Sequence, residues 1–192
     1  VYNHYTKKNN VIIQDDDKVV YLISSKGKIL WKKQIGGIIL DKVNQMDFYK
    51  NEKLQYIFNT EDSLYILDRL GRNVENFPIK LSAKAKRGHS LLDYDKNRKY
   101  RILVPSENGM VYNYSKEGKA VTGWEFEKMN IPISHQIQYL NIKGKDYIYV
   151  VDSDGNTNVV GRNGKKRTNI GKIPIKSSYY IDKKDGSIYT SD

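Results

Sequence analysis

The sequence contains no cysteine, which excludes disulfide bonds, thiolate metal sites and cysteine nucleophiles and leaves the cellular compartment undecided. Proline is scarce, with four residues in a chain of 192. No run of about 18 apolar residues occurs, so this segment encodes no membrane span. The start, VYNHYTKKNN, lacks the apolar centre of a signal peptide, and any targeting signal is expected outside the segment.

Motifs that bind phosphate or carry out catalysis are also missing. The chain has no glycine loop of the form GxGxxG or GxxxxGK[ST], and none of its serines stands in a GxSxG setting. No pair of residues is marked as a catalytic acid and base. We therefore expect no catalytic residues, no cofactor and no enzyme activity; an enzyme would need side chains from outside this segment.

One short pattern recurs along the chain. The stretch VVYLISSKGKILWKK, residues 19 to 33, reads as a β-forming run, a tight turn and a return strand. Its glycine, Gly27, has counterparts in Gly71, Gly118 and Gly164, at spacings of 44, 47 and 46 residues, each followed by Lys or Arg. Each glycine is expected to take the positive φ that a tight hairpin needs. Four turns in register indicate a repeat protein.

Each repeat also contains an earlier hairpin, with the turns TKKNN, YKNEK, DKNRK, IKGKD and DKKDG. The second repeat shows the full plan of four strands, at residues 45–49, 54–59, 64–68 and 74–81. Four antiparallel strands at this period are typical of a β-propeller blade, and no helical periodicity competes with that interpretation. We expect blades at approximately residues 1–36, 37–82, 83–130 and 131–176, with a partial blade at 177–192.

The fold predicted is therefore all-β, a propeller segment with four complete four-stranded antiparallel blades and a partial fifth. A closed ring removes sheet edges, whereas an arc leaves them exposed. We expect the segment to belong to a longer chain whose further blades complete a ring of seven or eight. A five-bladed ring with an incomplete last blade is the alternative.

Two families share motifs with these repeats. The stretch SSKGKILWKKQIGG, with Gly27 four residues before Trp31, resembles the repeat of quinoprotein-type (PQQ-like) propellers. The hairpins DFYKNEKLQYIF and DYDKNRKYRILV resemble decayed FG-GAP repeats. The tryptophan motif is complete only in the first repeat, since Trp124 follows Gly118 by six residues and the other two repeats have no tryptophan there.

The resemblance implies a choice between functions. Similar propellers include cofactor-dependent dehydrogenases and a non-catalytic lipoprotein that scaffolds outer-membrane protein assembly. The chain also looks like envelope propellers of AT-rich Gram-negative bacteria, in keeping with its Lys, Asn, Ile and Tyr usage. We expect a non-catalytic scaffold in a periplasmic or outer-membrane-associated complex. The alternative is a cofactor- or carbohydrate-binding propeller with its site in the central channel.

Metal sites are weakly indicated. In FG-GAP repeats a loop of closely spaced carboxylates binds calcium, which prefers hard oxygen ligands. The best copy here has Asp93, Asp95 and Asn97, but basic residues occupy the following ligand positions. The loop from Asp152 through Asp154 and Gly155 to Asn156 is a second candidate, although DSDG is also an ordinary turn. The expectation is no bound metal.

Two histidines occupy matching repeat positions. His89 and His135 each lie 29 residues before their repeat glycine, which places them at the start of adjacent inner strands. Two imidazoles facing a central channel could bind a metal or an anion. Repeat inheritance explains the coincidence equally well, and the matching residue of the second repeat is Lys42.

Charge is the feature that points to a partner. The net charge is +11, and the first and third turns of the blades, which leave on one rim, carry 21 of the 33 basic residues. The second turns, on the opposite rim, carry mainly acids such as Asp15, Asp16, Asp17, Glu61 and Asp154. If lysines merely favoured exposed turns, they would occur in all turns alike. The proposed anion-binding residues are Lys50, Lys53, Arg69, Arg72, Lys96, Arg98, Lys99, Lys116, Lys119, Lys143, Lys145, Arg162, Lys165, Lys166 and Arg167.

A basic rim of this kind predicts an anionic partner. We expect an acidic protein surface within a larger complex, with anionic lipid headgroups as the second class. Nucleic acid ranks last, because no aromatic stacking platforms are interleaved with the basic residues.

Overall fold

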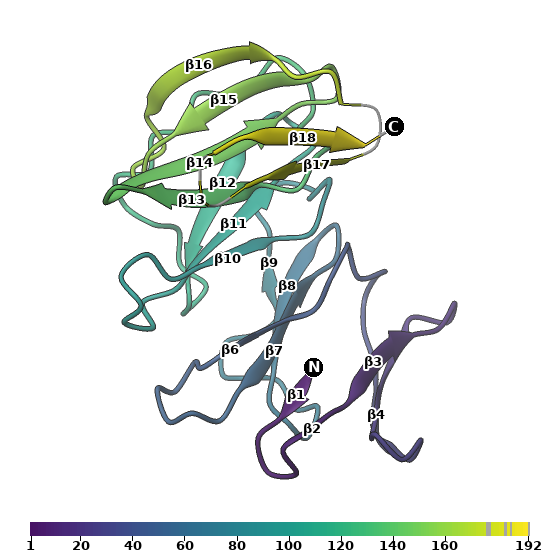
Figure 1. The fold of residues 1–192 in the computed structure, drawn as a ribbon. Helices are drawn as coiled ribbons and strands as arrows, with labels where there is room; N and C mark the ends of the chain where they lie inside the picture. The colour runs from purple at the N-terminus through teal and green to yellow at the C-terminus, as the bar shows by residue number, and fades with distance from the viewer. Residues whose placement is uncertain (176–177, 183, 185, 192) are drawn as a thin grey trace.

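Strands and connecting turns make up the described part of the chain (Figure 1). The computed structural model describes residues 1–175, 178–182, 184 and 186–191, and in these residues it contains no helix. It follows that this part holds no helix long and apolar enough to cross a membrane. The paired strands named below run antiparallel. The all-β fold predicted from the repeats is confirmed.

The second repeat forms a complete four-stranded sheet whose central strands are buried on both faces. Its strands, in hydrogen-bonded order, are β6 (Asn44–Met46), β7 (Gln55–Asn59), β8 (Ser63–Leu67) and β9 (Ile79–Lys80). Successive side chains of a strand point to opposite faces, so Tyr56 and Phe58 pack toward the first repeat while Ile57 packs toward the third. This double burial explains why the centre of β7 is apolar at consecutive positions.

The other repeats follow the same plan with local differences. In the first repeat, two backbone hydrogen bonds between Val1 and Asn10, of 2.8 and 2.9 Å, connect the opening hairpin to the main sheet. The last described strands pair as a hairpin. The strands are β1 (Tyr2–Asn3), β2 (Lys8–Asn9), β3 (Val11–Gln14), β4 (Val19–Ile23), β5 (Ile29–Gln34), β10 (Ser90–Leu92), β11 (Arg101–Pro105), β12 (Val111–Ser115), β13 (Gln138–Ile142), β14 (Lys145–Val151), β15 (Asn156–Val160), β16 (Lys166–Lys172), β17 (Ser178–Ile181) and β18 (Ile188–Ser191).

The third repeat departs from the predicted four-strand plan. Where the second and fourth repeats have an outer strand, β12 makes only an isolated bridge from Tyr114 to Ala120. The Val121 amide and the Trp124 indole still donate to β12, at the Asn113 and Val111 carbonyls. The following blade holds the segment as well, because the Glu125 N–H donates a 2.8 Å hydrogen bond to the Asn163 carbonyl. The irregular outer edge of this sheet is therefore bound both to its own strand and to the neighbouring blade.

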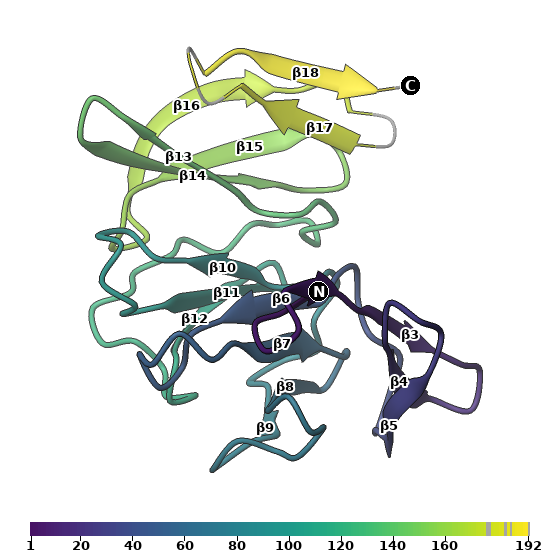
Figure 2. The ribbon, with the colours of Figure 1, turned by 60° about the horizontal axis from the view of Figure 1, so that its bottom comes forward.

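Hydrophobic cores lie between successive sheets, which follow one another in an arc (Figure 2). Ile57 of β7 and Ile102 of β11 belong to one core, and Leu103 of β11 and Ile148 of β14 belong to the next. All four side chains are fully buried. Each blade thus completes its core only by packing against its neighbours, as in other repeat proteins.

The repeated glycine of one blade receives an aromatic ring from the preceding blade. A Cβ built on Gly71 would lie 2.8 Å from the Trp31 ring, and one built on Gly164 would lie 3.1 Å from the Trp124 ring. The expected positive φ is confirmed at Gly27, Gly71, Gly118 and Gly164, with values from 77° to 82°. Trp124 therefore takes the same position relative to the next blade as Trp31, although it follows its repeat glycine by six residues and Trp31 by four. The irregular outer edge of the third repeat accommodates the two additional residues.

Candidate functional site

The first and third turns of each blade leave the sheet on the same side, since an antiparallel meander reverses direction at every turn. In Figure 1 the turns between β1 and β2, β6 and β7, β10 and β11, and β13 and β14 lie along the lower and left side. The turn between β3 and β4 lies on the right. We define the basic rim as the fifteen lysines and arginines predicted above, all of which lie in or beside first or third turns.

Aspartates shape the first turns of the second and third repeats. The two carboxylate oxygens of Asp47 accept hydrogen bonds from the Asn51 and Glu52 amides at 2.9 and 2.8 Å. Asp93 accepts equivalent bonds from the Asn97 and Arg98 amides at 3.1 and 2.9 Å. The carboxylates that a calcium loop would use for the ion are thus engaged in holding the turn. No group of three or more metal-binding side chains occurs in the part of the chain described.

Several cations of the basic rim are neutralised by acids. Arg98 lies 3.1 Å from Asp47 and 3.8 Å from Glu52, which connects the first turns of neighbouring blades. Lys116 donates to the Phe48 carbonyl at 2.7 Å and lies 4.4 Å over the Phe48 ring. Charges that serve such internal contacts contribute less to attracting a partner. The cations with ion pairs are Arg72, Arg98, Lys116, Arg162 and Lys165.

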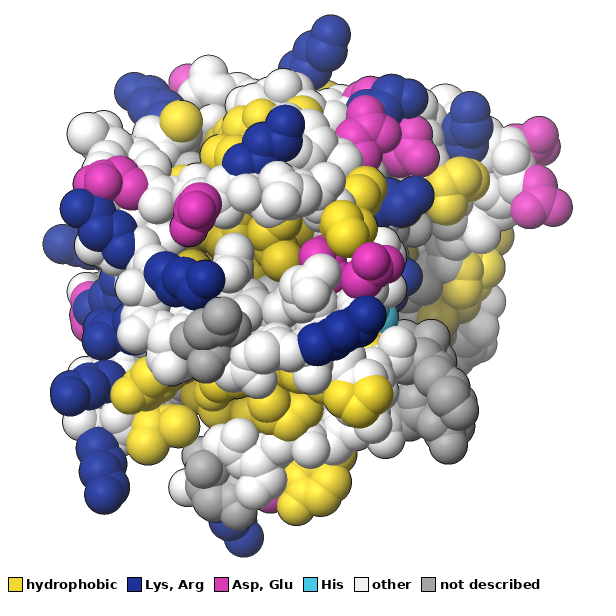
Figure 3. All heavy atoms as spheres, turned by 90° about the horizontal axis from the view of Figure 1, so that it is seen from above, with side chains coloured by type: hydrophobic (Ala, Val, Ile, Leu, Met, Phe, Trp, Pro, Cys, Tyr) yellow, Lys and Arg dark blue, Asp and Glu magenta, His cyan; other side chains and the backbone are white. Residues whose placement is uncertain are grey.

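The other ten cations of the basic rim form no ion pair among the described residues. Lys and Arg side chains gather along the left edge of Figure 3, which is viewed from above Figure 1, while acids are more frequent toward the right. Two of the ten, Arg69 and Arg167, lie over the rings of Tyr5 and Tyr147. The ten are Lys50, Lys53, Arg69, Lys96, Lys99, Lys119, Lys143, Lys145, Lys166 and Arg167.

A charged cluster joins the third and fourth repeats at this rim. Arg162 donates to Asp95 at 2.7 Å and to Asp146, which is only 4% exposed. Tyr139 and Asn141 also donate to Asp146. Burial alone would raise the pKa of Asp146, but these three donors outweigh it and lower the pKa below its ordinary value. Burial and the Asp146 carboxylate raise the pKa of Tyr139 to about 12.

This cluster predicts a pH-dependent contribution to stability. A carboxyl with a lowered pKa stabilises the fold above its ordinary pKa, and the stabilisation is lost as the pH falls through the folded-state value. We expect Asp146→Asn to lower the free energy of unfolding by about 1 to 2 kcal/mol at pH 7. Urea titrations should show the difference from the parent chain shrinking as the pH falls toward 2. A difference that is the same at both pH values contradicts the argument.

A matched control is Tyr139→Phe, which removes one donor to Asp146 but keeps the ion pair with Arg162. Its cost at pH 7 is expected to be smaller than that of Asp146→Asn, since hydrogen bonds from charged groups contribute more.

The acids of the opposite rim also have structural roles. Asp152 is buried and accepts hydrogen bonds from the Asp154 amide and from the backbone and side-chain nitrogens of Asn156, at 2.8 to 2.9 Å. The second candidate cation loop is thus an Asx-type turn closed by its own carboxylate. Glu61 lies 3.6 Å from Lys84, so part of the negative charge on this side is balanced as well.

The two predicted channel histidines lie in different surroundings. His89 is 1% exposed, and its Nδ1 and Nε2 lie 3.2 Å from the side chains of Asn59 and Asn44. Burial, followed by the charge of Lys42, lowers the pKa of His89 to about 3, so the ring is neutral. His135 is half-buried, and its ring packs edge-on against Tyr179. Both nitrogens of His89 are occupied, which favours a structural role for this residue; a joint site remains a prediction.

Two hollows border the inner strands. One, of about 480 Å³, is lined by residues in or just before the first strands of four successive sheets, including Lys42, Asn44, Gln136, Tyr139 and Tyr180. Polar and aromatic side chains of this kind can bind a small molecule. A central-channel site is the alternative predicted from the sequence, but the pattern did not identify the walls of this cavity, because they come from four repeats.

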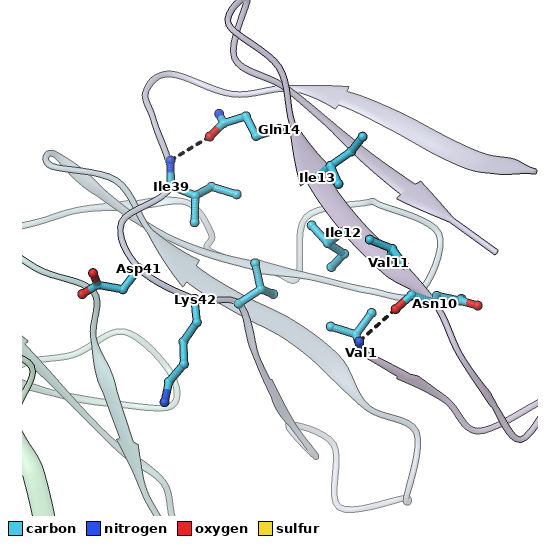
Figure 4. Close-up of a pocket in the computed structure, with 10 residues that line it drawn as sticks. Val1, Asn10, Val11, Ile12, Ile13, Gln14, Ile39, Asp41 and Lys42 are labelled. Atoms are coloured by element: carbon cyan, nitrogen blue, oxygen red, sulfur yellow. Dashed lines mark hydrogen bonds between the residues drawn. The ribbon is translucent and has the colours of Figure 1, made fainter. Parts of the chain in front are cut away.

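A groove of about 560 Å³ runs along β3 (Figure 4). Val11 and Ile13 on its strand are 54% and 47% exposed. Gln14 closes one end by accepting a 2.8 Å hydrogen bond from the Ile39 amide, and Asp41 and Lys42 border the opposite wall. The groove combines aliphatic and polar side chains, and its one lysine, Lys42, is not among the fifteen residues of the basic rim.

Comparison with known proteins identifies the fold but no family. No family model and no curated protein matches the sequence. The crystal structure of BBS1N in complex with ARL6DN matches 88% of this chain and 50% of its own, with a TM-score of 0.64 and 14% sequence identity. The WD40 domain of Pan2 from Neurospora crassa matches 87% of this chain and 51% of its own, with a TM-score of 0.54 and 14% identity.

BamB from Moraxella catarrhalis is also similar, with a TM-score of 0.54, 14% identity, and coverage of 90% of this chain and 53% of its own. The chain therefore spans about half the length of the solved structures it matches. At these identities the similarity shows the fold alone, and that fold is the predicted β-propeller.

Proposed function

We propose that the chain is a non-catalytic β-propeller scaffold that binds an acidic partner protein through its basic rim. The observation that carries the proposal is the set of ten rim cations that form no ion pair within the described part of the chain. They are positioned by turns that leave the blades on one side. Their charges are free to attract an anionic surface and to accelerate association with it. The non-catalytic part is supported by Asp47, Asp93 and Asp152, whose carboxylates hold turns, and by the neutral, hydrogen-bonded His89.

The setting that we propose is a bacterial cell-envelope complex, periplasmic or associated with the outer membrane. Two similarities support it: the resemblance of SSKGKILWKKQIGG to PQQ-like repeats, and the fold shared with BamB from Moraxella catarrhalis. Protein binding is in keeping with the similar fold solved as BBS1N in complex with ARL6DN. Anionic lipid headgroups are a second ligand class for the same rim.

A charge-reversal experiment tests the rim. We expect Lys96→Glu, Lys99→Glu and Lys143→Glu together to weaken binding to immobilised polyglutamate on the order of tenfold, because each reversal replaces attraction by repulsion. The matched variant reverses Lys80, Lys86 and Lys128, which are also exposed but lie outside these turns. Binding is measured over a range of salt concentrations. Equal losses in the two variants contradict a functional rim, since they reflect net charge alone.

A second candidate function is ligand binding in the 480 Å³ cavity at the inner strands, as a quinone-cofactor or carbohydrate site. To distinguish this candidate from the scaffold function, pyrroloquinoline quinone or N-acetylglucosamine is added to the parent chain and to the rim variants. The tyrosine signals are followed by NMR. Binding that is lost in Tyr180→Ala and unaffected by the rim reversals favours this candidate over the scaffold.

A further inference from the structure

A small notch opens on the basic rim between the first and second repeats. Its volume is about 200 Å³, and it is formed by the first turns of both repeats and the third turn of the second. The residues that matter for charge are His4, Lys53, Asp68, Arg69 and Arg72.

The charge balance in this notch is positive. Arg72 donates to the Asp68 carboxylate at 2.7 Å, which neutralises the one acid in its lining. Lys53 and Arg69 have no ion pair among the described residues. Two cations are therefore available to a ligand.

Arg69 is also held in place. Its guanidinium carbon lies 4.4 Å from the centre of the Tyr5 ring, and its backbone carbonyl accepts a 3.0 Å hydrogen bond from the Trp31 indole. A guanidinium fixed by stacking loses less entropy when it binds an anion than a free side chain does.

In the part of the chain that the structure describes, His4 has an unsatisfied ring nitrogen in the notch. Its Nε2 is buried and has no hydrogen-bond partner among the described residues, an arrangement that costs free energy. Burial, followed by the charges of Arg69 and Lys53, lowers the pKa of His4. An anion placed between these cations would offset their positive charges and stabilise the protonated ring.

We propose that the notch binds a carboxylate group of an acidic side chain on the partner protein. This inference rests on the proposed function of the rim. A singly charged carboxylate suits two available cations and can accept two hydrogen bonds from Arg69. Phosphate could also bridge the two cations and is the competing ligand that the test below distinguishes.

The test is an NMR titration of the 192-residue chain with hexaglutamate, with hexaglutamine as the uncharged control. We expect hexaglutamate, and not hexaglutamine, to raise the pKa of His4 toward its ordinary value. His89 and His135 are internal references whose signals stay unchanged. The double variant Lys53→Gln, Arg69→Gln should bind hexaglutamate on the order of tenfold less tightly and show no change at His4.

The matched control is Lys96→Gln, Lys99→Gln, which removes the same charge from the rim away from the notch and should lose less than about threefold. If the double variant unfolds at a lower urea concentration than the parent chain, Lys53→Gln alone replaces it in the test, because this side chain is exposed. Equal losses in both double variants overturn the notch and leave rim binding intact. No binding of hexaglutamate to the parent chain overturns both. Inorganic phosphate that raises the pKa of His4 as strongly overturns the carboxylate assignment.

Discussion

Replacing Gly155 with alanine is expected to lower the free energy of unfolding by about 3 to 5 kcal/mol, measured by urea denaturation. Gly155 has a φ of +85°, where a side chain is strained, and a Cβ built there would lie 2.0 Å from the Ile173 carbonyl oxygen. That carbonyl cannot withdraw freely, because the Ile173 amide donates a 2.8 Å hydrogen bond to the Gly155 carbonyl. The added methyl group must therefore push two backbone segments apart.

Gly27→Ala separates the cost of the positive φ from the cost of the backbone contact. Gly27 has a similar φ of +77°, but a Cβ there would meet nothing within 4 Å. We expect this control to cost about 1 to 2 kcal/mol, the strain of the left-handed conformation alone. Similar losses at the two glycines would contradict the close approach of the chain at Gly155.

Replacing Trp124 with alanine is expected to lower the free energy of unfolding by about 2 to 3 kcal/mol. The half-buried ring lies against Gly164 of the next blade and is stacked with Phe126 at a centroid distance of 6.2 Å. Since the third repeat has no regular outer strand, this ring is a main anchor of the segment after Ala120. Urea denaturation measures the loss, and hydrogen exchange at the Glu125 amide should become faster.

Trp124→Phe is the matched control. It keeps an aromatic ring over Gly164 but removes the 2.7 Å hydrogen bond from the indole N–H to the Val111 carbonyl. We expect it to cost about 1 kcal/mol. If alanine and phenylalanine cost the same, the hydrogen bond rather than the docked ring stabilises this junction.

Ion pairing refines the interpretation of the basic rim. Arg98 and Arg162 each connect turns of neighbouring blades through acids, so part of the positive charge stabilises the arc. Each such ion pair at a partly exposed site contributes little to the free energy of folding. The rim cations that pair with no acid in the described ranges are therefore the better guide to a binding surface. The reversal experiment at Lys96, Lys99 and Lys143 uses three of them.

The architecture could be predicted from local features of the sequence. The spacing of Gly27, Gly71, Gly118 and Gly164 predicted the repeat, because positive φ in a tight turn is a local requirement that a single residue meets. The alternation of β-forming runs and turns predicted antiparallel sheets and hence which turns share a rim. Both inferences depend on neighbours within a few residues, which a sequence displays directly.

Which of these side chains are engaged in internal contacts and which are available to a partner depends on how the blades pack together. Asp95 and Arg162 are 67 residues apart, and His89 and Asn44 are 45 apart, yet each pair is in contact. The same holds for the docking of Trp124 on Gly164, which follows from the lost outer strand of the third repeat and not from the motif. Contacts between blades depend on how whole sheets pack together, so the pattern within one repeat cannot reveal them.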